Sequence, residues 1–333
     1  MGCNLAIAGV TGAVGQEFLK ILEERDFPFD SLKVLASSRS AGKKIEFKGR
    51  QYIVEQLTEN SFSRVDIALF SAGGARSKEF APVAAKAGAV VVDNSSAFRM
   101  DPDVPLVIPE INPQQIQKHK GIIANPNCST IIAIVPVWPL HKANPVKRMV
   151  ISTYQAASGA GHSAMVELEN QTREILEGKQ PTCKAFPYQI AFNVFSHNSE
   201  LDATGYNLEE VKMVKETRKI FDCPDIAITC TCIRIPVFRA HCESINLEFT
   251  DPITPDQVRD LLSTAPGVSL IDDREHNRFP MPIDATGRDN IYVGRIRQDE
   301  SIPDKRGINI WVAGDQLRKG AALNAVQIAE KLL

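Results

Sequence analysis

One cysteine of this chain lies where cysteine chemistry is favoured. Cys128 belongs to the run NPNCST at 125–130, immediately ahead of the apolar stretch IIAIV at 131–135. This pattern predicts a helix start, where unpaired N–H groups and a partial positive charge favour a thiolate. Because the thiolate is the nucleophilic form, we predict that Cys128 is an activated nucleophile. The alternative is an inert buried thiol.

His241 is the candidate acid–base partner. Cysteine catalysis needs a group that takes the thiol proton and later delivers it, although a lone histidine is more often structural. Arg234 lies seven residues earlier. Its guanidinium could hold a carboxylate through two parallel hydrogen bonds, or form a surface ion pair. Residues seven apart in one regular strand face opposite sides, so we expect Pro236 to mark a bend or strand end.

A glycine-rich turn near the N-terminus predicts a nucleotide site. The apolar strand Leu5–Ala8 runs into GVTGAVG at 9–15, and Phe18, Leu19 and Leu22 follow at helical spacing. Strand, glycine turn and helix is the context of a dinucleotide fingerprint, with the pyrophosphate on the helix N-terminus. The spacing is G-x-x-G-x-x-G and not the commoner G-x-G-x-x-G, so an ordinary strand–helix turn is the alternative.

The end of the second strand favours NADP over NAD. The apolar run Leu32–Ala36 is followed directly by SSRS at 37–40. An NAD site usually has an acid here for the ribose 2′-hydroxyl, whereas this turn has a cation and three hydroxyls that suit a 2′-phosphate. We therefore predict NADP as the cofactor. The alternative is a polar loop with an incidental arginine.

A redox cofactor and a cysteine nucleophile together indicate the oxidation of an aldehyde through a thiohemiacetal and a thioester. Six stretches occur in the order that one family shows: AGVTGAVG at 8–15, DNSSAFRM at 93–100, NPNCST at 125–130, TYQAASGAG at 153–161, RIPVFRAH at 234–241 and WVAGDQLRKGAALNAVQIAE at 311–330. On these stretches the chain resembles, nearly end to end, the bacterial-type aspartate-β-semialdehyde dehydrogenase family. The last block contains GDQLRKGAA where the family more often has ADQLRKGAA, with Gly314 in place of alanine.

The resemblance implies an NADP-dependent, reversible, phosphorylating oxidation. L-aspartate 4-semialdehyde would become L-4-aspartyl phosphate, in the synthesis of lysine, methionine and threonine. Cys128 would attack the aldehyde and His241 would manage the proton. N–H groups at the start of the Cys128 helix would hold the oxyanion. The family also implies a homodimer or a homotetramer.

The resemblance assigns further residues to the substrates. Gln155 would act in catalysis by orienting the acyl group, although it could simply be a polar residue ending a strand. Arg234 would bind the substrate α-carboxylate. Arg99 and Lys212 would hold phosphate, and Glu209 would bind the substrate amine. Without the resemblance, Glu209 and Lys212 would be interpreted as a solvated ion pair three residues apart on one helix.

The expected cofactor contacts lie mostly on turns that follow strands. Ligands of open α/β sheets bind outside the carboxyl ends of the strands, where these loops fall. The residues are Gly9, Thr11, Gly12, Ala13, Val14, Ser37, Arg39, Ser40, Ser71, Gly73, Ser158, Gly159 and Gln316.

The pattern of apolar runs predicts an α/β protein with two domains. The first ~125 residues alternate strands and helices, as expected for a Rossmann-like parallel sheet. Strands and helices then mix as in an α+β catalytic and dimerisation domain, and the C-terminal helix is expected to return to the nucleotide domain. We predict an NADP-binding domain at 1–126 plus 315–333 and a catalytic domain at 127–314. The expected strands include Leu5–Ala8, Leu32–Ala36, Ile67–Phe70, Val90–Val92, Leu106–Ile108, Ile122–Ala124, Val146–Ala156 and the pair Ile226–Ile235 and Ser244–Phe249; the expected helices are Ser163–Gly178, Asn207–Phe221 and Gln316–Leu333.

Composition excludes several classes of protein. The net charge of −2 gives no electrostatic case for nucleic acid or an anionic membrane. No apolar run approaches the ~18 residues that span a bilayer, and no signal-peptide layout is present. The seven scattered cysteines indicate reduced thiols in the cytoplasm, and no spacing indicates a metal site.

Three other functions remain open. A related acyl-phosphate reductase, such as an N-acetyl-glutamyl-phosphate reductase, would share the fold and the cysteine nucleophile. The stretches NPNCST and RIPVFRAH favour the aspartate enzyme. A cysteine hydrolase would use Cys128 and His241 without redox chemistry, against which the nucleotide fold and Arg39 count. A regulatory paralogue without catalysis should lack the cysteine or the histidine, and this chain has both.

Overall fold

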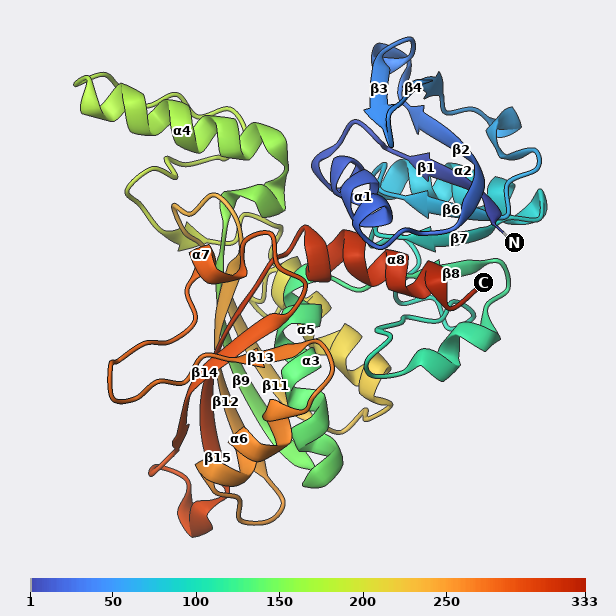
Figure 1. Cartoon of the computed structure of the whole chain (residues 1–333). Helices are drawn as coiled ribbons and strands as arrows, with labels where there is room; N and C mark the ends of the chain where they lie inside the picture. Colours follow the sequence, from blue (N-terminus) through green and yellow to red (C-terminus); the bar gives the residue numbers. More distant parts are fainter. Residues whose placement is uncertain (1) are drawn as a thin grey trace. The chain divides into compact units, whose positions relative to one another are not determined.

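The computed structural model describes residues 2–333, which form two compact units. The first unit comprises the described residues up to Asn127 together with Ala321–Leu333, and the second comprises Cys128–Gly320 (Figure 1). The chain thus returns to the first unit with its last helix, as the sequence predicted. No helix within residues 2–333 is both long and apolar enough to cross a membrane.

A parallel sheet forms the centre of the first unit. Its strands follow the order β5-β2-β1-β6-β7-β8, and each neighbouring pair is parallel. This confirms the predicted Rossmann-like sheet. The strands are β1 Cys3–Ala8, β2 Phe29–Ala36, β5 Glu55–Gln56, β6 Ile67–Phe70, β7 Val90–Asp93 and β8 Ile122–Ala124.

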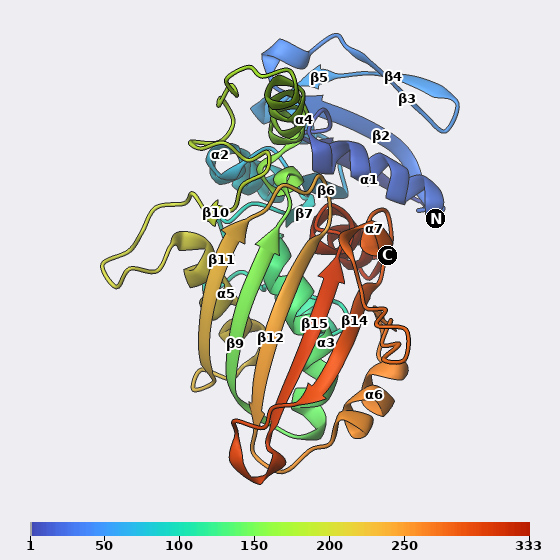
Figure 2. The same cartoon turned by 90° about the vertical axis from the view of Figure 1, so that its left-hand side faces the viewer.

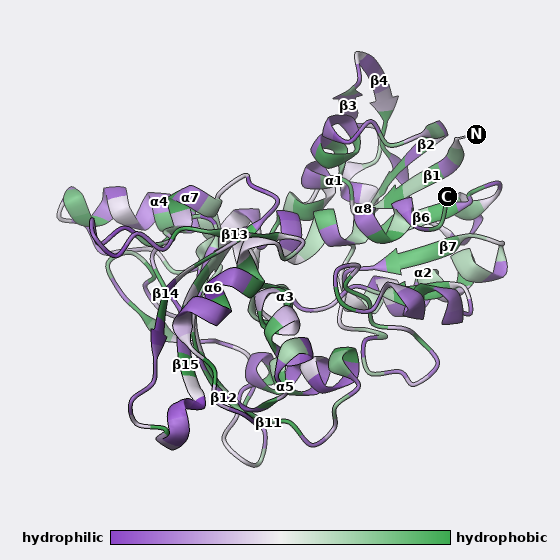
Figure 3. Ribbon diagram, turned by 60° about the horizontal axis from the view of Figure 1, so that its bottom comes forward, coloured by the Kyte–Doolittle hydropathy of each residue, from purple (hydrophilic) through white to green (hydrophobic). Residues whose placement is uncertain are grey.

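Helices cover both faces of this sheet, which is why its central strands are apolar. All four residues of β6 are buried, and β7 is hydrophobic over most of its length (Figure 3). Helices α1 (Ala13–Glu24) and α8 (Leu323–Glu330) share one core with alternate residues of β1, and α2 (Gly74–Lys86) shares a second core with the others. The short elements η1 Ser38–Ser40, η2 Glu59–Phe62 and η3 Pro113–Lys118 and the hairpin β3 Lys44–Phe47 with β4 Arg50–Ile53 complete the unit.

The strand predicted at Leu106–Ile108 is wrong. Leu106 makes only an isolated bridge to Ala124. The side chain of Asn112 accepts the N–H of Ile108 and donates to the carbonyl of Leu106, both at 2.9 Å. A side chain thus satisfies backbone groups that a strand partner would otherwise bond.

The second unit is built on a mixed sheet. The strand order is β10-β11-β9-β12-β15-β14-β13, and β9 is the central partner that pairs parallel with β11 and antiparallel with β12. This is the α+β arrangement expected from the sequence. The strands are β9 Val146–Gln155, β10 Phe195–Ser196, β11 Ala227–Arg234, β12 His241–Phe249, β13 Val268–Leu270, β14 Ile291–Gln298 and β15 Gly307–Gly314.

The predicted pairing of the strands now seen as β11 and β12 is wrong, because β9 lies between them. Their connection, residues 235–240, crosses the end of β9. There Ile235 N–H donates to the Gln155 carbonyl at 3.1 Å, and Ala157 N–H donates to the Val237 carbonyl at 2.8 Å. The strand end expected near Pro236 is confirmed, since β11 stops at Arg234.

Helices α3, α5 and α6 lie behind the sheet in the view of Figure 2. α5 begins as its sequence signal predicts, because Asn207 and Glu210 bond each other's backbone N–H groups in a capping box. The predicted C-terminal helix is interrupted, since a π-helix precedes α8. The remaining helical elements are α3 Cys128–Ala143, α4 His162–Leu176, α5 Leu208–Phe221, α6 Pro255–Ser263, α7 Pro282–Ala285, η4 Ala157–Ala160, η5 Pro303–Lys305 and η6 Arg318–Ala322.

Candidate active site

Ends of neighbouring elements gather the predicted catalytic residues of the second unit. Gln155 and Arg234 are the last residues of β9 and β11 and lie opposite each other in the ladder. His241 is the first residue of β12, the other neighbour of β9. Cys128 is the first residue of α3, which packs against β9 and β12. The crossing at residues 235–240 therefore places Arg234 and His241 on either side of one strand end.

His241 is held with one nitrogen toward the cysteine. Its Nε2 lies 3.7 Å from Cys128 Sγ, and its Nδ1 accepts the N–H of Ala156 at 3.0 Å. Because Nδ1 is an acceptor, the neutral ring carries its proton on Nε2, the nitrogen that faces sulfur. Burial, followed by the charge of Arg234, lowers the pKa of His241 to about 3. The resting His241 is thus a neutral Nε2–H donor.

Arg234 is a buried cation with neutral partners. Its side chain donates from Nη1 to the Ala156 carbonyl at 3.3 Å and from Nη2 to Nε2 of His197 at 2.8 Å, while Nε has no hydrogen-bond partner among the described residues. The residue is only 5% exposed. Burial lowers the pKa of Arg234, and the charge of Glu209 opposes this only in part. An incoming carboxylate would therefore stabilise this site by bonding the buried cation directly.

Gln155 connects the cysteine helix to α5. Its Nε2 donates to Ser129 Oγ at 2.6 Å and to Glu209 Oε1 at 3.1 Å. Its Oε1 is buried without a hydrogen-bond partner within residues 2–333. Gln155 is therefore fixed beside the residue that follows Cys128.

Glu209 and Lys212 differ from a solvated surface pair. Lys212 Nζ lies 3.1 Å from Glu209 Oε2, and the Glu209 side chain is 6% exposed against 33% for Lys212. Glu209 also lies in the first turn of α5, where the helix dipole favours a carboxylate. The buried acid and its partly exposed partner can both face a polar ligand.

Sequence reasoning missed His197, which contacts Arg234. The half-buried ring also lies 3.1 Å from Ser199 Oγ, and that oxygen accepts the N–H of Glu209 at 3.2 Å. Burial, followed by the Arg234 charge, lowers the pKa of His197 to about 4. His197 follows the two-residue strand β10 in an otherwise irregular segment. No regular spacing of apolar residues in this segment therefore pointed to His197.

Ser158, Gly159 and Gln316, which we predicted to contact the cofactor, pack around His241 and its preceding loop. A Cβ at Gly159 would lie 2.9 Å from Arg234 Nη1 and 3.0 Å from His241 Cε1. Gln316 donates from Nε2 to Ser158 Oγ and accepts the N–H of Ala240 at 2.9 Å. Ala240 has a φ of 72°, a strained value for alanine. These bonds fix the backbone immediately before His241.

The glycine turn of the first unit forms part of a cavity of about 170 Å³. Gly9 has a φ of 90°, and a Cβ there would lie 2.2 Å from the Ser71 carbonyl oxygen. A Cβ at Gly15 would lie 2.3 Å from the Gly9 oxygen. The turn thus requires glycine at both positions and leaves backbone exposed for a dinucleotide. The cavity is lined by Gly9, Thr11, Gly12, Ala36, Ser37, Leu57, Ser71, Ala72 and Arg76.

The other predicted cofactor residues of this unit lie outside that lining but on adjoining elements. Ala13 and Val14 open α1, and Gly73 caps α2. Arg39 and Ser40 belong to η1, which follows β2. Arg76, in the first turn of α2, lines the cavity and was missed. Its only sequence signal is a cation after the β6 turn.

Arg99, predicted to bind phosphate, lies in the first unit and is buried. Its Nε donates to the Asn125 carbonyl at 2.9 Å and its Nη2 to the Asn94 carbonyl at 2.8 Å. Lys212 lies in the second unit. Their joint action on one phosphate therefore stays a prediction.

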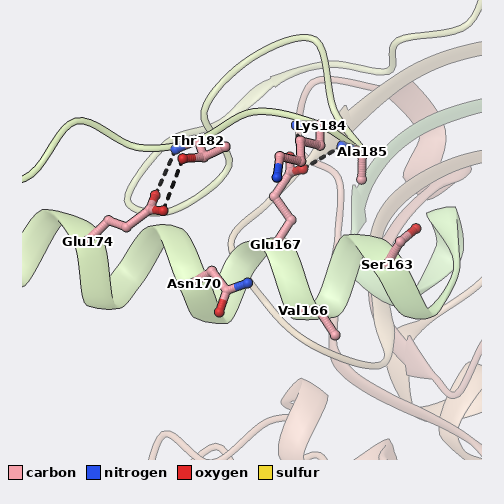
Figure 4. Close-up of a pocket in the computed structure, with 8 residues that line it drawn as sticks. All are labelled: Ser163, Val166, Glu167, Asn170, Glu174, Thr182, Lys184 and Ala185. Atoms are coloured by element: carbon pink, nitrogen blue, oxygen red, sulfur yellow. Dashed lines mark hydrogen bonds between the residues drawn. The ribbon is translucent and has the colours of Figure 1, made fainter.

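A larger cavity, about 470 Å³, lies along α4 and is shown in Figure 4. Glu174 accepts the N–H and hydroxyl of Thr182, and Glu167 accepts the N–H groups of Lys184 and Ala185. These acids hold the following loop against the helix. The lining residues are Ser163, Val166, Glu167, Asn170, Glu174, Thr182, Lys184 and Ala185, which include none of the predicted site residues.

Comparison with known proteins identifies the family. Residues 4–119 match the family described as "Semialdehyde dehydrogenase, NAD binding domain", and residues 137–319 match "Semialdehyde dehydrogenase, dimerisation domain". The aspartate-semialdehyde dehydrogenase of Synechocystis sp. is 56% identical, covering 99% of this chain and 97% of the relative. The Aquifex aeolicus protein of that name is 54% identical, covering 100% and 98%. The chain belongs to the aspartate-semialdehyde dehydrogenase family.

Solved structures agree with this assignment. The crystal structure of aspartate semialdehyde dehydrogenase II from Vibrio cholerae has a TM-score of 0.96 and 47% identity, covering 100% of this chain and 98% of that one. A second structure of the Vibrio protein, titled as a complex with ASA, has the same TM-score. The family resemblance predicted from the sequence is confirmed. It places the chain among oxidoreductases of amino-acid biosynthesis with a nicotinamide-nucleotide-binding Rossmann-type fold.

Proposed function

We propose that this chain catalyses the reversible, NADP-dependent, phosphorylating oxidation of L-aspartate 4-semialdehyde to L-4-aspartyl phosphate. The main support is the Cys128–His241 pair, in which a fixed Nε2–H donor lies 3.7 Å from sulfur. The buried Arg234 beside it, with only neutral hydrogen-bond partners among the described residues, adds the means to hold a carboxylated aldehyde. The pathway is lysine, methionine and threonine synthesis.

Substrate binding uses the charged residues around this pair. Arg234 takes the α-carboxylate, and Glu209 takes the α-amine. The two charges fix both ends of the amino-acid moiety and leave the aldehyde for Cys128. Gln155 orients the acyl oxygen from its position beside the start of α3. The resemblance suggests these roles, and the burial and hydrogen bonds of the three side chains within one unit support them.

The chemistry then runs through sulfur. Because the Nε2 of His241 that faces sulfur already carries a proton, Cys128 reacts as a thiolate whose proton has passed to solvent. The sulfur attacks the aldehyde carbon, and the resulting oxyanion is stabilised by His241 Nε2–H and by N–H groups at the start of α3. When bound, NADP⁺ would supply the hydride acceptor, so that the oxyanion lone pair could re-form the carbonyl and leave a thioester on Cys128. A phosphate oxygen attacks this carbonyl, the C–S bond breaks, and the electron pair returns to sulfur.

Arg99 and Lys212 would bind the attacking phosphate, because cations are required to bring two anionic reactants together. The glycine cavity suits the cofactor pyrophosphate, and Ser37, Arg39 and Ser40 suit a 2′-phosphate. The 13 predicted cofactor residues keep their proposed role, with Ser158, Gly159 and Gln316 also positioning His241. A homodimer is proposed because the second unit carries the matched dimerisation domain. All seven cysteines are free, which fits a reducing compartment such as the cytoplasm.

The test is the absorbance at 340 nm of purified protein mixed with aspartate semialdehyde and NADP⁺, with and without phosphate. We expect phosphate-dependent NADPH formation that disappears in Cys128→Ala and persists in Cys183→Ala, which removes an exposed free thiol. N-acetyl-glutamate semialdehyde serves as the comparison substrate. Faster turnover of that aldehyde would establish the alternative acyl-phosphate reductase, and full activity of Cys128→Ala would refute the cysteine mechanism.

A further inference from the structure

His197 lies between the two groups that we assign to the substrate's amino-acid end. Its Nε2 is 2.8 Å from Arg234 Nη2, and its Nδ1 is 3.1 Å from Ser199 Oγ. The same Ser199 oxygen is 3.2 Å from the backbone nitrogen of Glu209. A continuous set of hydrogen bonds therefore runs from the guanidinium to the first turn of α5.

The chemistry of arginine fixes the direction of these bonds. A guanidinium only donates, so Nε2 of His197 must accept. The neutral ring then carries its proton on Nδ1 and donates it to Ser199 Oγ at 3.1 Å, which also accepts the Glu209 N–H. The Ser199 backbone N–H lies 3.3 Å from the same Nδ1, but Nδ1 could accept it only in the other tautomer, which the shorter contact with Arg234 opposes. A protonated ring would point an N–H at the guanidinium, and both the geometry and the charge would oppose it.

The charge of the side chain that bonds the Arg234 guanidinium affects substrate binding. Arg234 is 5% exposed, and its hydrogen-bond partners among the described residues are the Ala156 carbonyl and His197. A carboxylate in the place of His197 would hold the guanidinium equally well but would neutralise it. The charged groups that act on His197 are Arg234, Glu209 and Lys212. Burial and the nearby Arg234 lower the pKa of His197 to about 4, so the ring is neutral at physiological pH.

We propose that His197 is a positioning residue for substrate recognition. Its neutral imidazole fixes the Arg234 guanidinium yet leaves the positive charge available for the α-carboxylate. Through its bond with Ser199, His197 also fixes the position of Arg234 relative to the start of α5, where Glu209 lies. The inference rests on the proposed role of Arg234. It adds the reason why an uncharged side chain is required at this position.

The decisive comparison is His197→Gln against His197→Glu. The two side chains have the same shape and reach and present an oxygen acceptor, but only Glu carries a charge. We expect the KM for aspartate semialdehyde to rise at least about tenfold more in the Glu variant than in the Gln variant. The kcat should change less, and the KM values for phosphate and NADP should not separate the two variants.

A purely structural role would predict something different. Equal KM values for aspartate semialdehyde in the Gln and Glu variants, both folded by circular dichroism, would overturn the inference. If Glu prevents folding, Ser199→Ala provides the second test, because it removes the acceptor of Nδ1–H. Its KM for aspartate semialdehyde should rise about threefold, the loss of one hydrogen bond, with the exposed Ser196→Ala as control; an unchanged KM would contradict the proposal.

A second aldehyde separates this inference from the proposed function. 3-Aminopropanal has the amine but no carboxylate, so the Gln and Glu variants should turn it over with similar kcat/KM. A similar difference between the variants for both aldehydes would refute the link to the carboxylate. An inactive wild-type protein would instead refute the proposed function, before any variant is compared.

Discussion

The glycine-turn cavity of the first unit and the proposed catalytic cluster around Cys128 and His241 in the second unit are built in different ways. Around Gly9 and Gly15 the backbone itself makes the shape, and an added Cβ would lie 2.2 Å or 2.3 Å from a carbonyl oxygen. Around His241 the side chains make the shape, and they are held by contacts with one another and with the backbone of Ala156. A turn of suitable backbone shape can bind a pyrophosphate through its N–H groups. A reaction instead needs particular side-chain atoms at fixed distances.

This difference predicts how substitutions should act. In the catalytic cluster a change of one atom should affect turnover, because each side chain is oriented by a neighbour. At the exposed edge of the first unit, a substitution of one side chain should alter only the preference for NADP over NAD. The four predictions below follow this order, from the largest expected effect to the smallest.

His241→Gln should have the largest effect of these. The variant keeps a polar side chain but loses the imidazole Nε2–H that we assign to the oxyanion, so kcat should fall about 10²–10³-fold. The assay is NADPH formation at 340 nm. His276→Gln, at a histidine whose side chain is 73% exposed, is the control and should retain activity. Comparable activity in the two variants would remove His241 from the mechanism.

The lowered pKa of His241 also predicts how stability and kcat depend on pH. Because its folded pKa of about 3 lies below the unfolded value near 6.5, the neutral ring contributes stability above about pH 6.5. That contribution is lost as pH falls from there toward 3. The kcat of the wild-type protein should therefore show no loss from His241 protonation between pH 5 and 8.

Gly159→Ala should be next, and it tests whether the side-chain cluster tolerates extra volume. The new Cβ would lie 2.9 Å from Arg234 Nη1, so the guanidinium or His241 must move. We expect kcat/KM for aspartate semialdehyde to fall at least about tenfold. Gly74→Ala is the matched control, because a Cβ there meets nothing within 4 Å. An unaffected kcat/KM in Gly159→Ala would show that the cluster is less tightly fixed than its distances suggest.

Arg39→Asp tests the edge of the nucleotide unit. Arg39 is exposed on η1, so its loss should not disturb the core. The KM for NADP should rise about tenfold relative to the KM for NAD, because a carboxylate repels a 2′-phosphate and accepts a 2′-hydroxyl. Arg50→Asp, on the exposed strand β4, is the control. An unchanged cofactor ratio would refute the assignment of this turn.

Glu243→Gln should change stability more than activity. Glu243 is fully buried, and neither carboxyl oxygen has a hydrogen-bond partner within residues 2–333. Burial, followed by the Glu209 charge, raises the pKa of Glu243 well above its ordinary value. The protonated form thus contributes full stability below the unfolded pKa of about 4.3, and the contribution is lost as pH rises through the folded pKa.

Gln cannot ionise, so the variant should escape that loss. Its Tm relative to wild type should be higher at pH 8 than at pH 5, by about 2 °C or more. Glu248→Gln, on the same strand but half-buried, should show no such difference. A Glu243→Gln variant with the same pH dependence as the wild-type protein would contradict a buried neutral acid.

Local signals account for what the sequence predicted well. The glycine turn, the capping box at Asn207, the helix start at Cys128 and the break near Pro236 each depend on a few neighbouring residues, and all are present. The parallel sheet was predicted because apolar runs alternate along the sequence with segments whose apolar residues have helical spacing.

Features that depend on distant residues could not be predicted this way. The insertion of β9 between β11 and β12 depends on where residues 235–240 cross, which no local pattern encodes. His197 was missed because its partner Arg234 lies 37 residues further along the chain. The strand expected at Leu106–Ile108 failed because a side chain, Asn112, occupies its backbone groups.

The central claim is that the substrate is held on Cys128 as a thioester, and a rapid-mixing experiment without phosphate tests it most directly. Enzyme mixed with aspartate semialdehyde and NADP⁺ should release a burst of NADPH equal to the number of sites and then stop. Intact mass should show the acyl group on Cys128, and added phosphate should restart turnover. Steady NADPH formation without phosphate, or a burst that persists in Cys128→Ala, would contradict the account.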